Sequence, residues 1–252
     1  MTMLALKRTG ESGPPLVFVH GYLGGAGLWE EQLQAFSDGF RCLAPNLAGF
    51  GDSAGMLAPD TIEGHARHVL DTLTEAGVDT FHLLGHSMGG MVVQQMAAMA
   101  PERIERLVLY GTGPVGMLPD RFEAIDVSRQ RLKTEGLQAT AARIAATWFE
   151  IGERAERYPI CLAEGAKATM QAALASLSAW ETWDGSDNLA AFPMPTLVIW
   201  GDGDRSYGWS QPERLWRTIP NCRLAVVPGC AHIVHMEKPE IFNAIVRDFL
   251  AG

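Results

Sequence analysis

Short runs of consecutive apolar residues recur along the chain, separated by longer segments with helical spacing. The apolar runs occupy residues 16–19, 40–47, 81–84, 107–110, 196–200 and 224–227. Because these runs are continuous rather than alternating, they are typical of strands that are buried on both faces of a sheet. The pattern therefore predicts a mostly parallel sheet covered on two sides.

Helices are predicted between these strands. Asp60 is the expected N-cap of a helix that runs to residue 76, with Glu63 at the capping-box position. Residues 88–100 form a second expected helix, and residues 239–250 form a third that begins with a proline. Strand–helix alternation of this kind predicts an α/β fold with a doubly wound sheet.

One long segment interrupts the alternation. From about residue 113 to 191 the sequence is Ala-rich and helical in pattern, without a convincing strand. We therefore expect residues 1–113 and 192–252 to form the core. Residues 114–191, the cap segment, are expected to be a helical cap inserted between two strands of the sheet.

Composition and charge exclude several classes of protein. The 252 residues are 47% hydrophobic and 19% charged, which is enough apolar material for a sizeable core. A net charge of -9 repels phosphate backbones, so nucleic acid is not an expected partner. No run approaches 18 apolar residues, so no membrane span is expected, and residues 1–15 lack a signal-peptide pattern.

The four cysteines indicate no metal or redox motif. Cys42, Cys161, Cys222 and Cys230 form no C-x-x-C pair, which argues against a zinc ribbon or a thioredoxin-like site. Cys42 and Cys222 lie in apolar stretches and are expected to be small buried side chains. Together with the missing signal pattern, this favours a reducing cytoplasm.

The sequence Gly-His-Ser-Met-Gly at residues 85–89 carries the main candidate chemistry. It follows an apolar run and precedes a predicted helix, which is the context of a nucleophile elbow. The alternative is an ordinary glycine-rich turn. In an elbow, Ser87 lies at the end of a strand and at the positive N-terminus of a helix. A serine hydroxyl needs an adjacent base to become a nucleophile.

A base and an acid follow the last two predicted strands. Asp204 and His232 both lie in loops at strand C-termini, the edge of an open α/β sheet that carries the ligand site. The chain order Ser, Asp, His is the order that this fold uses. Asp202 is the rival acid, although it could instead cap its turn. His235 is the rival base, and we expect it to line the pocket or to lie at the surface.

An oxyanion needs two preorganised N–H donors. Met88, the residue after the nucleophile, is one candidate, and Tyr22 in the glycine-rich loop 20–25 is the other. A phosphate-binding loop would need Gly-Lys-Ser/Thr, which residues 27–29 do not supply. For His20 two roles stay open, namely bonding to the loop backbone and contact with the substrate.

Other side chains are weaker candidates. Trp148 and Trp183 of the cap segment either line an apolar pocket or pack the cap onto the sheet, and Tyr207 follows Asp204 closely enough to border the site. His65 and His68 form an H-x-x-H pair without a third ligand, so a solvated helix face is favoured over a metal site.

Four motifs together resemble the α/β-hydrolase superfamily. They are His-Gly-Tyr at 20–22, Asn-Leu-Ala-Gly-Phe-Gly-Asp-Ser at 46–53, Gly-His-Ser-Met-Gly-Gly at 85–90, and the pair Gly201…Asp204 and Gly229…His232. The resemblance spans nearly the whole chain. It implies the α/β-hydrolase fold with a helical cap above the pocket.

The resemblance also implies a two-step mechanism. Ser87 attacks an acyl carbon while His232, oriented by Asp204, takes its proton; the amides of Tyr22 and Met88 hold the oxyanion, and water then releases the acid. No cofactor or metal is implied, and activity is expected to fall below about pH 6. Haloalkane dehalogenases and most epoxide hydrolases have Asp where Ser87 stands, so those branches drop out.

The motifs resemble small carboxylesterases and enol-lactonases, which implies hydrolysis of a small-molecule ester or lactone. Asp204 and the segment 230–232 also resemble meta-cleavage-product hydrolases, which break C–C bonds in vinylogous diketones. Those enzymes usually have Asn where His86 stands and Trp where Ile233 stands, so the ester or lactone is favoured. A ligand-binding homologue without catalysis is a third possibility, and the complete triad argues against it.

Overall fold

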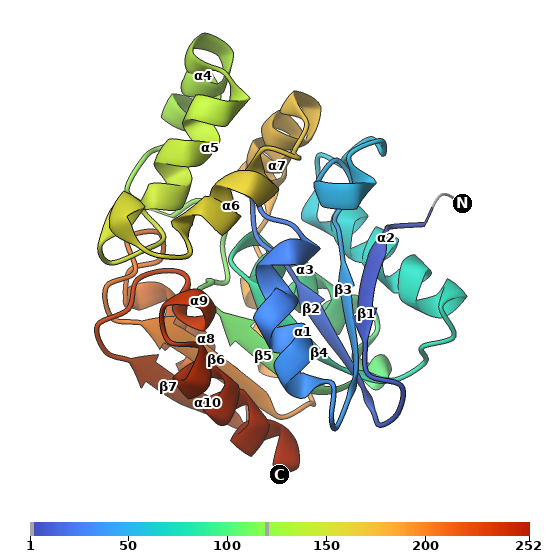
Figure 1. Ribbon diagram of the computed structural model, residues 1–252. Coiled ribbons are helices and arrows are strands. Elements are labelled where there is room, and N and C mark those ends of the chain that lie inside the picture. Colours follow the sequence, from blue (N-terminus) through green and yellow to red (C-terminus); the bar gives the residue numbers. More distant parts are fainter. Residues whose placement is uncertain (1–2, 119–120) are drawn as a thin grey trace.

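The computed structural model describes residues 3–118 and 121–252, and its centre is a seven-stranded sheet (Figure 1). The strand order is β1-β3-β2-β4-β5-β6-β7. β1 pairs antiparallel with β3, and the other neighbours pair parallel. The strands are β1 (Leu6–Thr9), β2 (Pro15–Val19), β3 (Arg41–Pro45), β4 (Phe81–His86), β5 (Ile104–Tyr110), β6 (Thr196–Gly201) and β7 (Cys222–Val227).

The six apolar runs correspond to β2 through β7, so their prediction as strands is confirmed. Burial on both faces is wrong for β7, because it is an edge strand and its Val226 is 45% exposed. Cys222 at its start is likewise only partly buried, unlike Cys42. The sequence pattern misses β1, whose residues Leu6–Thr9 alternate too weakly because the strand lies at the opposite edge.

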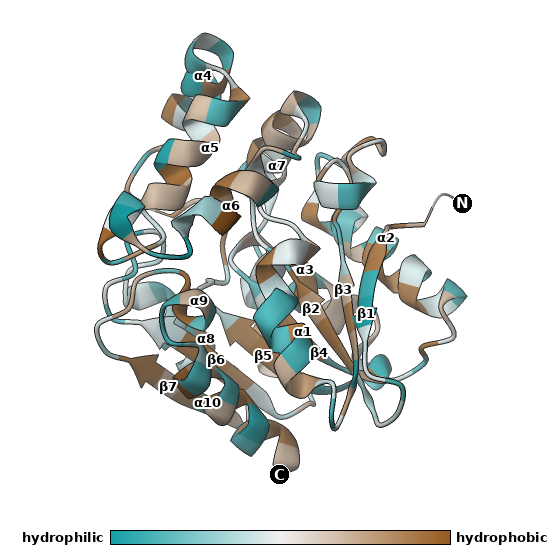
Figure 2. Cartoon of the chain, in the orientation of Figure 1, coloured by the Kyte–Doolittle hydropathy of each residue, from teal (hydrophilic) through white to brown (hydrophobic). Residues whose placement is uncertain are grey.

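Helices cover both faces of the sheet and enclose two apolar cores, which confirms the doubly wound architecture. Figure 2 shows the apolar strands at the centre and hydrophilic residues on the outer side of α1. α1 and α10 pack on one face, and α2, α3 and α8 pack on the other. Their bounds are α1 (Glu30–Phe36), α2 (Ile62–Glu75), α3 (Met88–Met99), α8 (Ser210–Thr218) and α10 (Pro239–Ala251), with the short α9 (Val234–Glu237) before α10.

Two details of α2 differ from expectation. The N-cap is Thr61 rather than Asp60, and its hydroxyl accepts a hydrogen bond from the Gly64 amide at 3.1 Å. His65 is fully buried instead of solvated, and burial lowers its pKa to about 3. The apolar face of α2 rotates His65 toward the core because Ile62, Ala66 and Val69 share that face.

The described part of the cap segment contains four α-helices between β5 and β6, placed beyond the C-terminal ends of the strands in Figure 1. They are α4 (Ile125–Glu135), α5 (Leu137–Ala146), α6 (Tyr158–Gly165) and α7 (Met170–Thr182). The segment leaves and re-enters the core at one place, where Val115 bridges Asp184 and the Gly185 amide donates to the Pro114 carbonyl at 2.9 Å. Over the described part of the chain, no helix is long and apolar enough to cross a membrane.

Candidate active site

Ser87 occupies a strained turn between β4 and α3. Its φ of 57° and ψ of -121° lie in a region that residues with a side chain rarely adopt. The turn is held by the Ser87 amide, which donates to the Tyr110 carbonyl at 3.0 Å. Gly89 is required for close packing, because a Cβ there would lie 2.3 Å from the Val19 carbonyl oxygen. Residues 85–89 therefore adopt the tight strand–turn–helix geometry of an elbow, with Ser87 at the edge of the sheet.

His232 and Asp204 form a buried pair next to this turn. The Nδ1 of His232 lies 2.8 Å from Oδ2 of Asp204. The other carboxylate oxygen of Asp204 accepts the backbone amides of Ser206 at 2.7 Å and Tyr207 at 3.1 Å. Since the carboxylate accepts at Nδ1, that nitrogen carries the ring proton and Nε2 is the nitrogen left to act as a base. Ser87 and His232 line the same pocket.

The two rivals have other environments. Asp202 accepts a hydrogen bond from the Gly229 amide at 2.7 Å, so it joins its turn to the loop after β7 and does not cap its own turn through this bond. His235 is fully buried and stacks on Trp29 with the ring centroids 4.3 Å apart. The expectation that His235 lines the pocket or lies at the surface is therefore wrong, because α9 turns it toward the core below the site.

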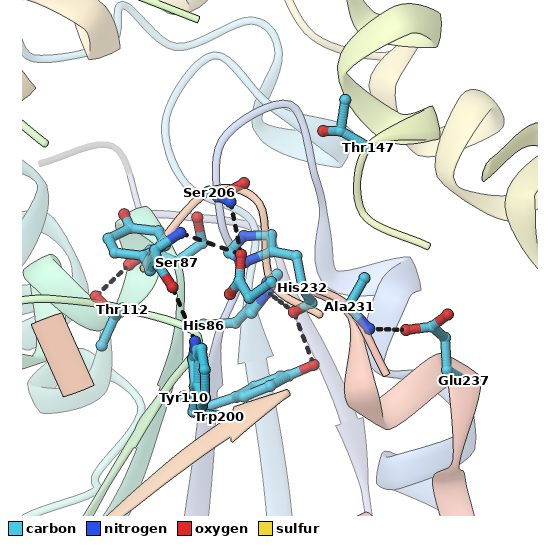
Figure 3. A network of polar contacts seen from close by, with 12 residues as sticks. His86, Ser87, Tyr110, Thr112, Thr147, Trp200, Ser206, Ala231, His232 and Glu237 are labelled. Atoms are coloured by element: carbon cyan, nitrogen blue, oxygen red, sulfur yellow. Dashed lines mark hydrogen bonds and ion pairs between the residues drawn. The ribbon is translucent and has the colours of Figure 1, made fainter. Parts of the chain in front are cut away.

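A buried polar network holds the main chain of His232 through hydrogen bonds to its carbonyl oxygen (Figure 3). Its carbonyl oxygen accepts Nε2 of His86 at 3.0 Å and the hydroxyl of Tyr110 at 3.1 Å. The same hydroxyl lies 3.2 Å from both the amide and Nδ1 of His235, whose Nε2 donates to the Leu28 carbonyl at 3.2 Å. Burial lowers the pKa of His86 well below its usual range and that of His235 to about 3, so both rings stay neutral.

Glu237 connects this loop to the cap segment. Its carboxylate accepts the Ala231 amide at 2.6 Å and the Glu150 amide at 2.7 Å. Burial raises its pKa, and the two amide donors offset part of that increase. The main chain before His232 is thus fastened to the cap, a connection that sequence spacing does not indicate.

The loop after β2 lies directly against Ser87. A Cβ on Gly21 would be 2.9 Å from the Cβ of Ser87, which brings the Tyr22 backbone next to the elbow. His20 is fully buried: its Nδ1 donates to the Gly21 carbonyl at 2.8 Å and its Nε2 accepts the Leu47 amide at 2.9 Å. Burial lowers the pKa of His20 to about 4. Of its two expected roles the structure shows the loop-bonding one, because both ring nitrogens are engaged with backbone.

A closed pocket lies between the core and the cap segment, with a cavity volume of about 20 Å³ that is enough for about one water. Trp148 and Tyr207 are among its lining residues, and the Tyr207 ring stacks on His232 with the centroids 5.6 Å apart. Trp183 points elsewhere and donates from Nε1 to Gln95 at 3.2 Å. The full lining is Tyr22, Ser87, Leu118, Arg121, Phe122, Ile144, Trp148, Trp180, Ser206, Tyr207 and His232.

Two further features bear on other chemistry. A larger depression of about 580 Å³ lies beside α2, lined in part by Met56, Leu57 and Arg67, and it contains none of the three triad candidates. Within residues 3–118 and 121–252, no three His, Cys, Asp or Glu side chains are grouped so that they could hold a metal ion.

Comparison with known proteins identifies the family. Residues 14–239 match the family model described as the alpha/beta hydrolase fold. The chain belongs to the α/β-hydrolase fold family. The match covers the elbow, the loop after β2 and the strands that precede Asp204 and His232.

Relatives of this α/β hydrolase have several names. It is 28% identical over 247 residues to a putative carbamate hydrolase RutD of Azorhizobium caulinodans, covering 94% of this chain and 91% of the relative. It is 28% identical over 264 residues to a 2-hydroxy-6-oxo-6-phenylhexa-2,4-dienoate hydrolase of Burkholderia cepacia, covering 95% and 88%. Among solved structures, an enol-lactonase from Burkholderia xenovorans superimposes with a TM-score of 0.89 at 26% identity, covering 99% of this chain and 96% of that one.

Proposed function

We propose that this α/β hydrolase is a serine hydrolase that cleaves a small-molecule carboxylic ester or lactone. The observation that carries the proposal is the buried His232–Asp204 pair, 2.8 Å apart, in the same pocket as Ser87 on its strained turn. An adjacent base held by a carboxylate is what a serine needs to become a nucleophile.

The proposed reaction has two steps. Ser87 Oγ attacks the carbonyl carbon while Nε2 of His232 takes its proton, and the protonated ring then gives that proton to the leaving oxygen. Water, deprotonated by His232, attacks the acyl-enzyme and releases the acid and Ser87. The backbone amides of Tyr22 and Met88 are proposed to bind the oxyanion, because the first adjoins the elbow and the second begins α3.

The pocket is proposed to open by displacement of side chains that the cap segment contributes. A cavity of about 20 Å³ is too small for an ester, and six of its lining residues come from the cap segment: Leu118, Arg121, Phe122, Ile144, Trp148 and Trp180. Displacing the apolar side chains among them enlarges the pocket without moving Asp204 or His232, which lie on the core.

C–C bond hydrolysis is the second candidate, supported by the name of the Burkholderia cepacia relative. In this chain His86 is buried beneath His232, and its Nε2 is bonded to the His232 carbonyl. Ile233 is also fully buried, with its amide bonded to the Trp148 carbonyl at 3.1 Å, so it leaves no polar group in the pocket. We therefore place ester or lactone hydrolysis first.

Labelling with a fluorophosphonate probe tests the proposal. Wild-type protein should be labelled and Ser87→Ala should not. Ser178→Ala, which removes a hydroxyl on α7 that donates to the Leu174 carbonyl, should be labelled like wild type. Absence of labelling in wild type would leave a ligand-binding protein as the better description. A larger kcat/KM for a vinylogous 1,5-diketone than for an aryl ester would reverse the order of the two enzyme candidates.

A further inference from the structure

Arg121 places a positive charge in the wall of the pocket that contains Ser87 and His232. Its guanidinium packs on two aromatic rings, 4.9 Å from the ring centres of Phe122 and Trp180. The segment is fixed to the core by the Phe122 amide, which donates to the Arg205 carbonyl at 3.1 Å. The charge is therefore held in one orientation at the pocket.

Among the described residues, Arg121 lacks the carboxylate partner that Arg129, Arg131, Arg143 and Arg157 of the cap segment have. Among residues 3–118 and 121–252, no carboxylate oxygen lies within 4.0 Å of the Arg121 guanidinium. The carboxylate of Glu123 is already bonded to Arg131 at 3.1 Å and to Arg143 at 2.8 Å. Nη1 of Arg121 instead donates to the Glu123 carbonyl at 2.9 Å and to Ser128 Oγ at 3.4 Å.

Arg121 is partly buried, which is unfavourable for its charge. Burial lowers its pKa, and the neighbouring Tyr207, Tyr22 and Glu123 offset only part of that effect. A guanidinium stays protonated in proteins, so the desolvation cost remains until an anion binds. A carboxylate fits the remaining N–H donors because its two oxygens match the planar fork of an arginine and one charge neutralises the other.

We propose that Arg121 binds a free carboxylate carried by the substrate, so that the ester or lactone hydrolysed by this protein is an anion. The inference rests on the proposed function for the identity of the scissile bond. It makes Arg121 a specificity-determining residue: the carboxylate bound at the guanidinium fixes the position of the carbonyl at Ser87. The alternative is a purely structural role, in which Arg121 stabilises its own segment through the hydrogen bonds to Glu123 and Ser128.

Matched esters separate the two readings. The substrates are mono-p-nitrophenyl esters of succinate, glutarate and adipate, each compared with its neutral methyl ester. Wild type should prefer at least one of the acids by about 10- to 100-fold in kcat/KM, the range expected for charge-assisted hydrogen bonds to a partly buried group. Arg121→Gln should remove most of that preference, whereas Arg121→Lys should keep part of it because the charge remains without the fork.

Arg129→Gln is the matched control. Arg129 is also a cap arginine, but it pairs with Asp126 and Glu181 on the outer surface, so its loss should leave the acid-to-ester ratio unchanged. If Arg121→Gln lowers kcat/KM equally for the acids and for the neutral esters, Arg121 has a structural role only. A wild type that prefers the neutral esters would also overturn the inference.

A binding arm decides the question without turnover. Monomethyl glutarate and dimethyl glutarate are titrated by calorimetry into Ser87→Ala and into Ser87→Ala with Arg121→Gln. The acid should bind the first protein at least about tenfold more tightly than the diester, and the second should bind both alike. If wild type cleaves no ester but the acid still binds through Arg121, the proposed function fails and the anion site stands. Equal binding of acid and diester overturns the anion site alone.

Discussion

The Tyr110 hydroxyl is the centre of the network behind His232, and Tyr110→Phe removes that one atom without changing the shape of the ring. Two groups lose a hydrogen-bond partner at once. The His232 carbonyl keeps only the bond from His86, while the amide of His235 loses its acceptor, the hydroxyl oxygen 3.2 Å away. Both Tyr110 and His235 are fully buried, so water cannot replace the missing group.

The expected cost follows from those contacts. One lost buried hydrogen bond accounts for about 1 kcal/mol, and the amide of His235 left without an acceptor adds about 1–3 kcal/mol. The free energy of unfolding should therefore fall by about 2–4 kcal/mol, which for a chain of this length lowers Tm by about 5–15 °C. The effect on kcat/KM should be less than about tenfold, because His86 and Asp204 still hold His232.

Urea unfolding followed by tryptophan fluorescence measures the change. Tyr158→Phe is the control, since that hydroxyl makes one bond, to the Ala142 carbonyl at 3.0 Å, and its loss should cost about 0.5–1.5 kcal/mol. If the two variants lose equal stability within about 0.5 kcal/mol, the network does not act as a unit and the reasoning is refuted.

Three other outcomes are expected. Gly89→Ala should be destabilised by more than about 3 kcal/mol or fail to fold, because its Cβ would collide with the Val19 carbonyl, whereas Gly55→Ala, with open space, should melt like wild type. Asp204→Asn should lower kcat on an aryl ester by about 10³–10⁴ with little change in Tm; a loss below tenfold would remove Asp204 from the triad. Because the pKa of His65 falls to about 3 on folding, the unfolded chain binds its proton first, so stability should be full above about pH 6.5 and decline toward pH 3. At pH 5 this amounts to about 2 kcal/mol in urea unfolding, and a His65→Leu variant with an undiminished slope would contradict it.

The strands can be predicted well from the sequence because a strand buried on both faces of a parallel sheet consists of consecutive apolar residues. The prediction fails at the two edge strands, where the pattern of apolar residues is ambiguous. β1 reads Leu-Lys-Arg-Thr, which is weakly patterned, while β7 has apolar letters but an exposed Val226. Which strand lies at an edge depends on tertiary order, and the composition of a single strand does not contain it.

The candidate site shows the same division. Ser87, Asp204 and His232 could be predicted because each follows a strand, and strand ends converge at one edge of the sheet. The partners His86 and Tyr110 could not, since their contacts with the His232 carbonyl span 146 and 122 residues of chain and leave no local pattern. The role of Trp183 could not be decided for a related reason: helical spacing in a cap does not say which face meets the core.

The bridge between Val115 and Asp184 brings the two ends of the cap segment together, so the segment can be exchanged as one unit. The chain enters and leaves the cap segment at adjacent positions, because Pro114 and Gly185 are hydrogen-bonded to each other. The cap segment is therefore a single insertion between two strands of the sheet. A chimaera joined at these two positions would exchange the roof of the pocket, including Arg121, while the elbow and the network around Tyr110 keep their own sequence. Substrate specificity can therefore change in evolution through the cap segment, while the core residues around Ser87 stay the same.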